Sequence, residues 1–178
     1  MKETNVQNDD CHAGAYMAAH DIFALLSEMH LTFSTAESCT GGNIAHNFTL
    51  IPGSSEMFMG GIVSYSNSVK HRVLGVREDT LAAHGAVSRE VVEQMAEGAC
   101  RVCATDCSVA TSGIAGPGGA VPGKPVGTVW IAARCCDTMR SRLFHFSGSR
   151  EEIINLATSA AFSLLHSVII SHYAPGNR

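Results

Sequence analysis

Segments rich in β-branched and aromatic residues alternate with helix-like segments along this chain, and this alternation limits its fold more than any other feature. Helical periodicity fills much of the sequence between the first three strand-like segments. Strands that alternate with helices predict an α/β sandwich whose sheet is largely parallel. The expected strands cover residues 31–36, 60–66, 107–111, 127–133 and 142–146.

The last two expected strands break this alternation. Only a short segment around residues 135–140 joins them, which is the length of a hairpin connection. One of these two strands is therefore expected to run antiparallel to the rest of the sheet. The 178 residues fit one domain, which we place at residues 13–172, after a disordered polar tail at residues 1–12.

Capping patterns mark the starts of two long helices. Ser88 has the position of an N-cap for a helix that ends near residue 104. Ser149 and Glu152 form a capping-box pattern at the start of a final helix that ends near residue 171. Further helices are expected at residues 13–29, 43–50, 68–74 and 80–84.

The charge balance excludes a general affinity for polyanions. Lys and Arg total 12 and Asp and Glu total 16, so the net charge is −4 with His neutral. Such a chain has no overall attraction to nucleic acid or to an anionic membrane, and neither is expected as a partner. The sequence shows no signal peptide and no run of the ~20 apolar residues that a spanning helix needs. A cytoplasmic protein is the expectation.

The seven cysteines predict neither a disulfide framework nor a metal site. Their number is odd, and no secretory signal accompanies them. The spacing of Cys100, Cys103 and Cys107 suits a metal clip, but it also places all three on one face of a helix, which we favour. No second CxxC or HxxxH segment supplies further ligands, so no metal is expected.

The segment TAESCTGG at residues 35–42 joins the end of the first strand to the start of a helix. Ser38 lies at that junction, at the carboxyl end of the strand, where ligands bind in open α/β sheets. The N–H groups of Cys39, Thr40 and Gly41 follow at a helix N-terminus, where they can stabilise an oxyanion. Ser38 or Thr40 could instead only cap the helix, and the Cys39 thiol competes with Ser38 as a nucleophile.

The segment GGIVSYSNSVK at residues 60–70 offers a base. Tyr65 would end the second strand, and Lys70 would lie in the first turns of the next helix. A lysine acts as a base only when burial or a nearby cation removes its charge, and an adjacent tyrosine hydroxyl can relay the proton. From spacing alone, a solvated Lys70 and a half-buried Tyr65 are the favoured alternative.

A glycine-rich connection at residues 112–125 follows the third strand. Backbone N–H groups in such a connection can converge on a phosphate or on a ring. The segment matches neither GxxxxGK(S/T) nor GxGxxG. The alternative is a mobile loop, although a connection of this length in a small domain is more often functional.

Taken in order, these motifs resemble the CinA C-terminal domain family, whose stand-alone members include nicotinamide mononucleotide amidohydrolases. The resemblance extends from about residue 15 to residue 172. It implies a three-layer α/β/α sandwich with a mixed, mostly parallel five-stranded sheet. It also implies an amidohydrolase that uses a Ser–Lys pair and needs no metal or other cofactor. The matching text is TAESCTGG (35–42), IPGSS (51–55), GGIVSYSNSVK (60–70), LGV (74–76), HGAVS (84–88), SGIAGPGG (112–119), KPVGTVWIA (124–132) and FSGSR (146–150).

The family pattern assigns roles to particular residues of this chain. The nucleophile falls on Ser38, the base on Lys70 and the assisting hydroxyl on Tyr65. Glu37 is expected near the site without touching Lys70, since a carboxylate there would raise the pKa of the lysine. Many relatives carry an acidic residue where this chain has Gly118. The expected substrate-binding residues are Gly42, Asn67, Gly113, Ala115, Gly116, Lys124 and Arg150.

Nicotinamide mononucleotide is therefore the expected small-molecule partner, with its phosphate bound by the glycine-rich loop, Lys124 and Arg150. A catalytically silent nucleotide-binding or regulatory protein is the alternative, because some family members are known only as competence- or damage-related proteins. A homodimer is expected, since the last helix is apolar over a wide arc and small α/β enzymes are often symmetric. A redox or metal protein built on the seven cysteines would rest on their number alone.

Overall fold

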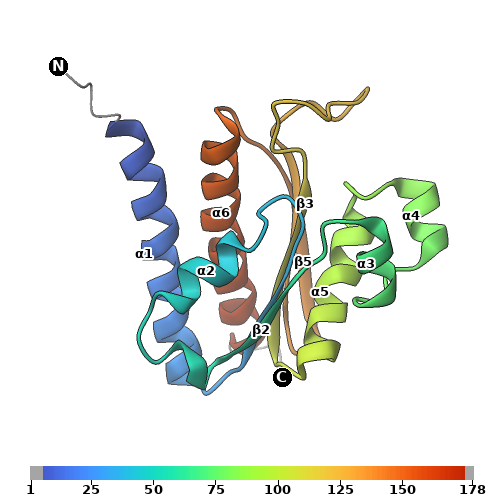
Figure 1. Ribbon diagram of the computed structural model, residues 1–178. Helices are drawn as coiled ribbons and strands as arrows, with labels where there is room; N and C mark the ends of the chain where they lie inside the picture. Colours follow the sequence, from blue (N-terminus) through green and yellow to red (C-terminus); the bar gives the residue numbers. More distant parts are fainter. Residues whose placement is uncertain (1–5, 175–178) are drawn as a thin grey trace.

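A five-stranded sheet with helices on both faces forms the centre of the computed structural model, which describes residues 6–174 (Figure 1). Helices α1, α2 and α6 cover one face, and α5 covers the other, with α3 and α4 beside it (Figure 1). The elements are α1 (Val6–Met29), β1 (Phe33–Glu37), α2 (Asn43–Thr49), η1 (Ser54–Glu56), β2 (Phe58–Val63), α3 (Asn67–Arg72), α4 (Glu78–His84), α5 (Arg89–Cys103), β3 (Cys107–Gly113), β4 (Thr128–Cys135), β5 (Thr138–His145) and α6 (Arg150–Tyr173).

The strand order is β2-β1-β3-β4-β5, and the sheet is mixed. Strand β1 pairs in parallel with both β2 and β3, whereas β4 is antiparallel to β3 and to β5. A tight turn at Cys136 and Asp137 joins β4 to β5, and Cys136 has the positive φ of 54° that such a turn needs. The three-layer α/β/α prediction with one antiparallel strand is confirmed.

Local capping explains where two long helices begin. The Ser88 side chain accepts a hydrogen bond from the Val91 N–H at the start of α5. Ser149 and Glu152 form the complete capping box at the start of α6. Both predicted helix starts are confirmed.

One helix boundary and the placement of one cysteine differ from prediction. Helix α1 begins at Val6, so residues 6–12 are helical and not part of a disordered tail; residues 1–5 lie outside the described residues. Helix α5 ends at Cys103, where Ala104 adopts a left-handed conformation (φ 53°) and its N–H donates to the Cys100 carbonyl. Cys107 therefore lies in β3, and the three cysteines do not share one helix face.

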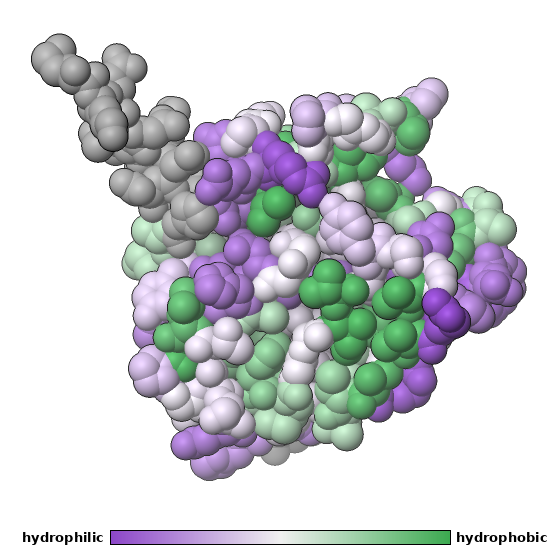
Figure 2. All heavy atoms as spheres, viewed as in Figure 1, coloured by the Kyte–Doolittle hydropathy of each residue, from purple (hydrophilic) through white to green (hydrophobic). Residues whose placement is uncertain are grey.

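Helix α6 uses its wide apolar arc inside the molecule. It packs against α1 on one side and against β4 on the other. Among the described helices it alone has the length and hydropathy to span a membrane, and half of that window is buried, as in a core helix. Figure 2 shows apolar side chains gathered elsewhere, where β2 meets the ends of α3 and α5; the exposed ones there are Met59, Val63, Val73 and Val102.

The two faces of the sheet are packed differently. Aromatic side chains of Phe33, Phe48 and Phe162 fill the layer beneath α1 and α6. Alanines and aliphatic side chains, such as Ala36 and Val92, fill the layer beneath α5, and among the described residues no buried phenylalanine belongs to this cluster. Both layers leave the carboxyl ends of β1, β2 and β3 at one edge of the sheet, which is where the candidate site is built.

Candidate active site

Ser38 follows the last residue of β1 and continues the sheet by one hydrogen bond, from its N–H to the Thr111 carbonyl of β3 (3.0 Å). This bond fixes the backbone from which the serine side chain projects. The Lys70 Nζ donates a hydrogen bond to the Ser38 Oγ at 3.0 Å. The structure thus brings together the two residues that the family pattern assigns as nucleophile and base.

Lys70 is buried, with only 1% of its surface exposed. The N-cap Ser66 starts the short helix α3, and this places Lys70 in the first turn, next to the strand that precedes it. Its Nζ also donates to the Ser64 carbonyl at 2.6 Å. Burial lowers the pKa of the Lys70 ammonium, because desolvation disfavours the charged form. The alternative of a solvated surface lysine is wrong.

Cys39 is a poor nucleophile in this setting. Burial raises the pKa of its thiol to about 12, and a hydrogen bond with Thr111 only partly opposes that effect. A thiol with such a pKa is protonated at neutral pH, and thiolate is the reactive form. The geometry and the pKa together favour Ser38 over Cys39 as the nucleophile.

Glu37 is fully buried and organises the turn that carries Ser38. Its Oε2 accepts hydrogen bonds from the Thr40 hydroxyl (2.7 Å) and from the N–H groups of Gly42 (2.9 Å) and Ile44 (3.1 Å). Its Oε1 accepts from the Ala45 N–H (2.9 Å) and from the Thr35 hydroxyl (3.2 Å). The carboxylate therefore neutralises the N-terminus of α2. Among the described residues it makes no hydrogen bond with Lys70, as expected.

The backbone N–H groups after Ser38 differ in availability. The Gly41 N–H donates to the Ser38 carbonyl (3.2 Å) within the turn, and the Gly42 N–H is bonded to Glu37. The structure therefore does not support the predicted roles of Gly41 as an oxyanion donor and of Gly42 as a substrate-binding donor, since both N–H groups are already bonded. Within the described part of the chain, the N–H groups of Cys39 and Thr40 remain without an acceptor.

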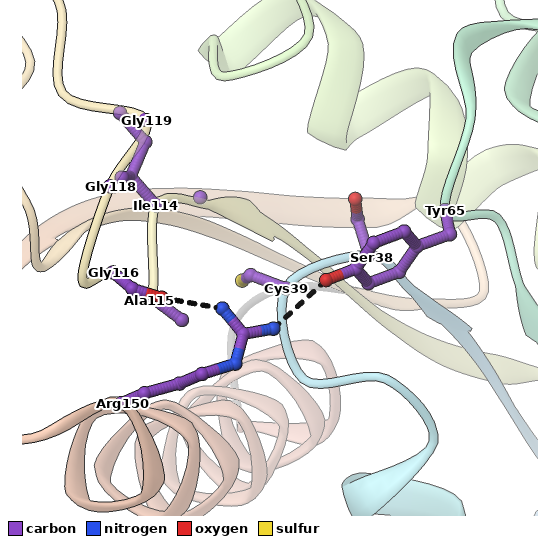
Figure 3. Close-up of a pocket in the computed structure, with 10 residues that line it drawn as sticks. Ser38, Cys39, Tyr65, Ile114, Ala115, Gly116, Gly118, Gly119 and Arg150 are labelled. Carbon is purple, nitrogen blue, oxygen red and sulfur yellow. Dashed lines mark hydrogen bonds between the residues drawn. The ribbon is translucent and has the colours of Figure 1, made fainter.

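A pocket of about 300 Å³ opens beside Ser38 (Figure 3). The glycine-rich loop after β3 forms one wall, and the predicted residues Gly113, Ala115 and Gly116 are part of it. Arg150, the first residue of α6, reaches across from another side. The lining residues are Ser38, Cys39, Tyr65, Gly113, Ile114, Ala115, Gly116, Gly118, Gly119 and Arg150.

Arg150 and Tyr65 contact each other in this pocket. One terminal nitrogen of Arg150, Nη1, donates to the Gly116 carbonyl at 2.7 Å, and Nη2 donates to the Tyr65 hydroxyl at 2.9 Å (Figure 3). The Tyr65 ring lies beside Ser38, but 62% of the residue is exposed (Figure 3). Both predicted residues are thus in the pocket, and the contact between them was not foreseen.

Two predicted substrate-binding residues lie elsewhere. The Lys124 Nζ donates to the carbonyls of Val87 (2.7 Å) and His84 (3.3 Å), so the ammonium ties the loop to the α4–α5 connection. Asn67 lines a separate hollow between α3 and α4. Neither residue lines the pocket at Ser38, so the structure does not bring these two predicted residues to the candidate site.

The cysteines and histidines do not form a metal centre in the part of the chain that the structure describes. No group of three or more His, Cys, Asp or Glu side chains there is arranged to hold a metal ion. The polar groups that line the pocket are a serine hydroxyl, a cysteine thiol, a phenol, a guanidinium and backbone groups, and the buried Lys70 amine contacts the serine hydroxyl.

Comparison with known proteins identifies the family of this chain. Residues 16–169 match the CinA C-terminal domain. The chain belongs to this family. It is 47% identical over 132 residues to a CinA-like protein of Thermotoga maritima, covering 74% of this chain and 32% of that protein. It is 52% identical over 120 residues to a CinA-like protein of Chloroherpeton thalassium, covering 67% of this chain and 29% of that protein. This CinA-domain chain thus spans about a third of the length of these relatives.

Solved structures of CinA proteins have the same fold over nearly their full length. The competence damage-inducible protein A (ComA) of Klebsiella pneumoniae matches with a TM-score of 0.85 and 32% identity, covering 90% of this chain and 99% of that one. The competence/damage inducible protein CihA of Agrobacterium tumefaciens matches with a TM-score of 0.85 and 37% identity, covering 88% and 96%. These names describe when the proteins are induced and do not state a reaction.

Proposed function

We propose that this CinA-family chain hydrolyses the carboxamide of nicotinamide mononucleotide to nicotinate mononucleotide and ammonia, in the cytoplasm, through an acyl-enzyme on Ser38. The observation that carries the proposal is the 3.0 Å contact between the Ser38 Oγ and the Nζ of the buried Lys70. A serine hydroxyl is a weak nucleophile unless a positioned base takes its proton. A buried lysine next to the hydroxyl supplies that base without a metal.

The first half of the reaction forms the acyl-enzyme. Ser38 attacks the carboxamide carbon while neutral Lys70 accepts the hydroxyl proton, directly across their hydrogen bond. The free N–H groups of Cys39 and Thr40 stabilise the oxyanion, where losing one donor typically costs about 10²–10³-fold in kcat. Lys70 then returns the proton to the departing ammonia, with the Tyr65 hydroxyl as the assisting group.

The second half consumes water. Water attacks the acyl carbon, Lys70 accepts a proton from that water, and Ser38 leaves with the proton restored to its oxygen. Throughout, the substrate keeps a cationic pyridinium ring in the pocket. A cation near Lys70 disfavours a second positive charge and so adds to the effect of burial on the lysine pKa. The ring also withdraws electrons from the amide carbon, which favours the quaternised amide over free nicotinamide.

The substrate's phosphate needs local donors, because the chain as a whole carries a net charge of −4. Arg150 is the one cation that lines the pocket among the described residues. Its guanidinium matches a phosphate geometrically, and backbone N–H groups of the glycine-rich loop lie on the adjacent wall. Lys124 is no longer part of this proposal, since its ammonium is bonded to two carbonyls. A homodimer remains part of this proposal.

Ammonia release tests this function. Purified protein is incubated with nicotinamide mononucleotide, nicotinamide riboside, nicotinamide and the dinucleotide, and ammonia is measured over time. We expect the mononucleotide to be the preferred substrate, Lys70→Ala to lose most of the turnover, and Arg72→Ala, a control in the same helix but outside the pocket, to retain it. If the folded wild-type protein releases ammonia from none of these compounds, the chain is a silent member of the family and the proposal is wrong.

A further inference from the structure

Arg150 has an unusual set of partners for a cation in a pocket. Among the described residues, its guanidinium donates hydrogen bonds to two neutral acceptors, the Gly116 carbonyl (2.7 Å) and the Tyr65 hydroxyl (2.9 Å). No carboxylate is present among the described residues that line the pocket. The positive charge beside Ser38 is therefore not neutralised from within the pocket, which suits an anionic ligand.

Tyr65 depends on this contact for its position. With 62% of the residue exposed, little packing fixes its side chain. The hydroxyl accepts its hydrogen bond from Arg150 and, among the described residues, makes none with Ser38 or Lys70. Figure 3 shows the ring beside Ser38 with the hydroxyl directed to the guanidinium. The group proposed to assist catalysis is thus held by Arg150 in this structure.

We propose that Arg150 couples phosphate binding to catalysis: the phosphate of the substrate takes the Nη2 donor of Arg150, and this releases the Tyr65 hydroxyl to serve the leaving group at Ser38. The inference rests on the proposed amide hydrolysis and adds to it a role for the phosphate in the chemical step. Arg150 acts here as a binding and positioning residue, since it does not touch the reacting carbon.

Hydrogen-bond strengths favour this exchange. A hydrogen bond from a guanidinium to a phosphate joins two ionised groups, whereas the bond to Tyr65 has a neutral acceptor, so a phosphate competes better for the Nη2 donor than the phenol does. The bond from Nη1 to Gly116 can persist, so the loop wall stays in place. The predicted kinetic signature is that the phosphate raises kcat, whereas simple uniform binding would lower only KM.

The exchange itself can be observed without turnover. The Ser38→Ala protein, with its tyrosines labelled with carbon-13 at the phenol carbon, is titrated with inorganic phosphate, and the Tyr65 NMR signal is identified by its loss in Tyr65→Phe. We expect phosphate to shift this signal saturably. We expect Arg150→Ala to abolish the shift and Arg142→Ala, which removes an arginine that lies over Phe144 on β5, to retain it.

A kinetic experiment then tests the coupling. Nicotinamide riboside carries the same amide and ring without the phosphate, so the riboside alone should be turned over with a kcat at least about tenfold below that of the mononucleotide, and added inorganic phosphate should restore part of the difference. Arg150→Ala should turn over the two substrates with similar kcat, and added phosphate should not change its kcat with the riboside. Tyr65→Phe should bind phosphate but gain no kcat from it.

The two experiments separate this inference from the proposed function. Absence of any amide hydrolysis, with a phosphate-dependent Tyr65 shift that needs Arg150, refutes the function and leaves the exchange in place. A Tyr65 signal that does not respond to phosphate refutes the coupling. So does a phosphate effect confined to KM, or a phosphate response of kcat that persists in Arg150→Ala.

Discussion

Replacing Glu37 by glutamine tests whether this carboxylate organises the turn that carries Ser38. The substitution keeps the shape of the side chain but changes one acceptor oxygen into a donor. The smallest disturbance places the new NH₂ group at Oε1, because the Thr35 hydroxyl can rotate there to accept a hydrogen bond. The Ala45 N–H, now 2.9 Å from that oxygen, then loses its acceptor inside the protein.

The magnitude follows from two losses. A buried N–H left without an acceptor costs about 1–3 kcal/mol. Removing a negative charge from the N-terminus of α2 costs about 0.3–1 kcal/mol more. Glu37→Gln should therefore lower the free energy of unfolding by about 1.3–4 kcal/mol, and at about 2–4 °C per kcal/mol the melting temperature should fall by about 3–16 °C for a chain of this size.

Urea unfolding followed by circular dichroism measures this change, with Glu78→Gln as the matched control. Glu78 also lies in the first turn of a helix, α4, but it is exposed. Its replacement should change the free energy of unfolding by less than about 0.5 kcal/mol. A Glu37→Gln protein as stable as the wild type, or no less stable than the control, would show that Glu37 does not organise the turn.

Three further predictions concern Lys70, metals and one close helix contact. Burial lowers the Lys70 pKa in the folded state, so between that pKa and the ordinary lysine pKa of about 10.4 the unfolded chain binds more protons than the folded protein. The free energy of unfolding of the wild type should therefore rise with pH towards about 10.4. Lys70→Met should remove this rise, as measured by urea unfolding at several pH values. A rise that persists in Lys70→Met would contradict this. Activity should survive EDTA, and loss that one divalent ion restores would overturn the metal-free site. Gly98→Ala should lower the free energy of unfolding by about 1–3 kcal/mol, because the new Cβ would overlap the Leu74 carbonyl oxygen. Gly14→Ala is the control, since a Cβ there has nothing within 4 Å, and it should not destabilise the protein. Equal losses of stability in the two variants, measured by calorimetry, would refute this prediction.

Features encoded in neighbouring residues could be predicted from the sequence. The caps at Ser88 and Ser149 depend on bonds three residues away, so local patterns located the starts of α5 and α6. The antiparallel strand was evident from a connection too short for a crossover. The pairing of Ser38 with Lys70 followed from the family motifs, while spacing alone favoured a solvated lysine.

Features that depend on contacts between distant segments could not be predicted from the sequence. The Lys124 ammonium donates to the carbonyls of His84 and Val87, about forty positions earlier in the chain, and nothing in the sequence around Lys124 indicates these contacts. The contact between Arg150 and Tyr65 joins residues 85 positions apart. Helix α5 ends close to its predicted end near residue 104, through the left-handed Ala104, so the helical spacing of Cys100, Cys103 and Cys107 did not place Cys107 on that helix. For Lys124 and Arg150, sequence spacing does not indicate which distant segments they contact.

The central claim is that Ser38, activated by Lys70, is the nucleophile, and turnover by two single variants tests it most directly. Initial rates of ammonia release from nicotinamide mononucleotide are measured for Ser38→Ala and for Cys39→Ser, with circular dichroism confirming that both are folded. Ser38→Ala should lose at least about three orders of magnitude in kcat, and Cys39→Ser should remain active, because the buried Cys39 thiol with a pKa of about 12 takes no part in the attack. An inactive Cys39→Ser together with a fully active Ser38→Ala would contradict the account and place the reaction on the thiol.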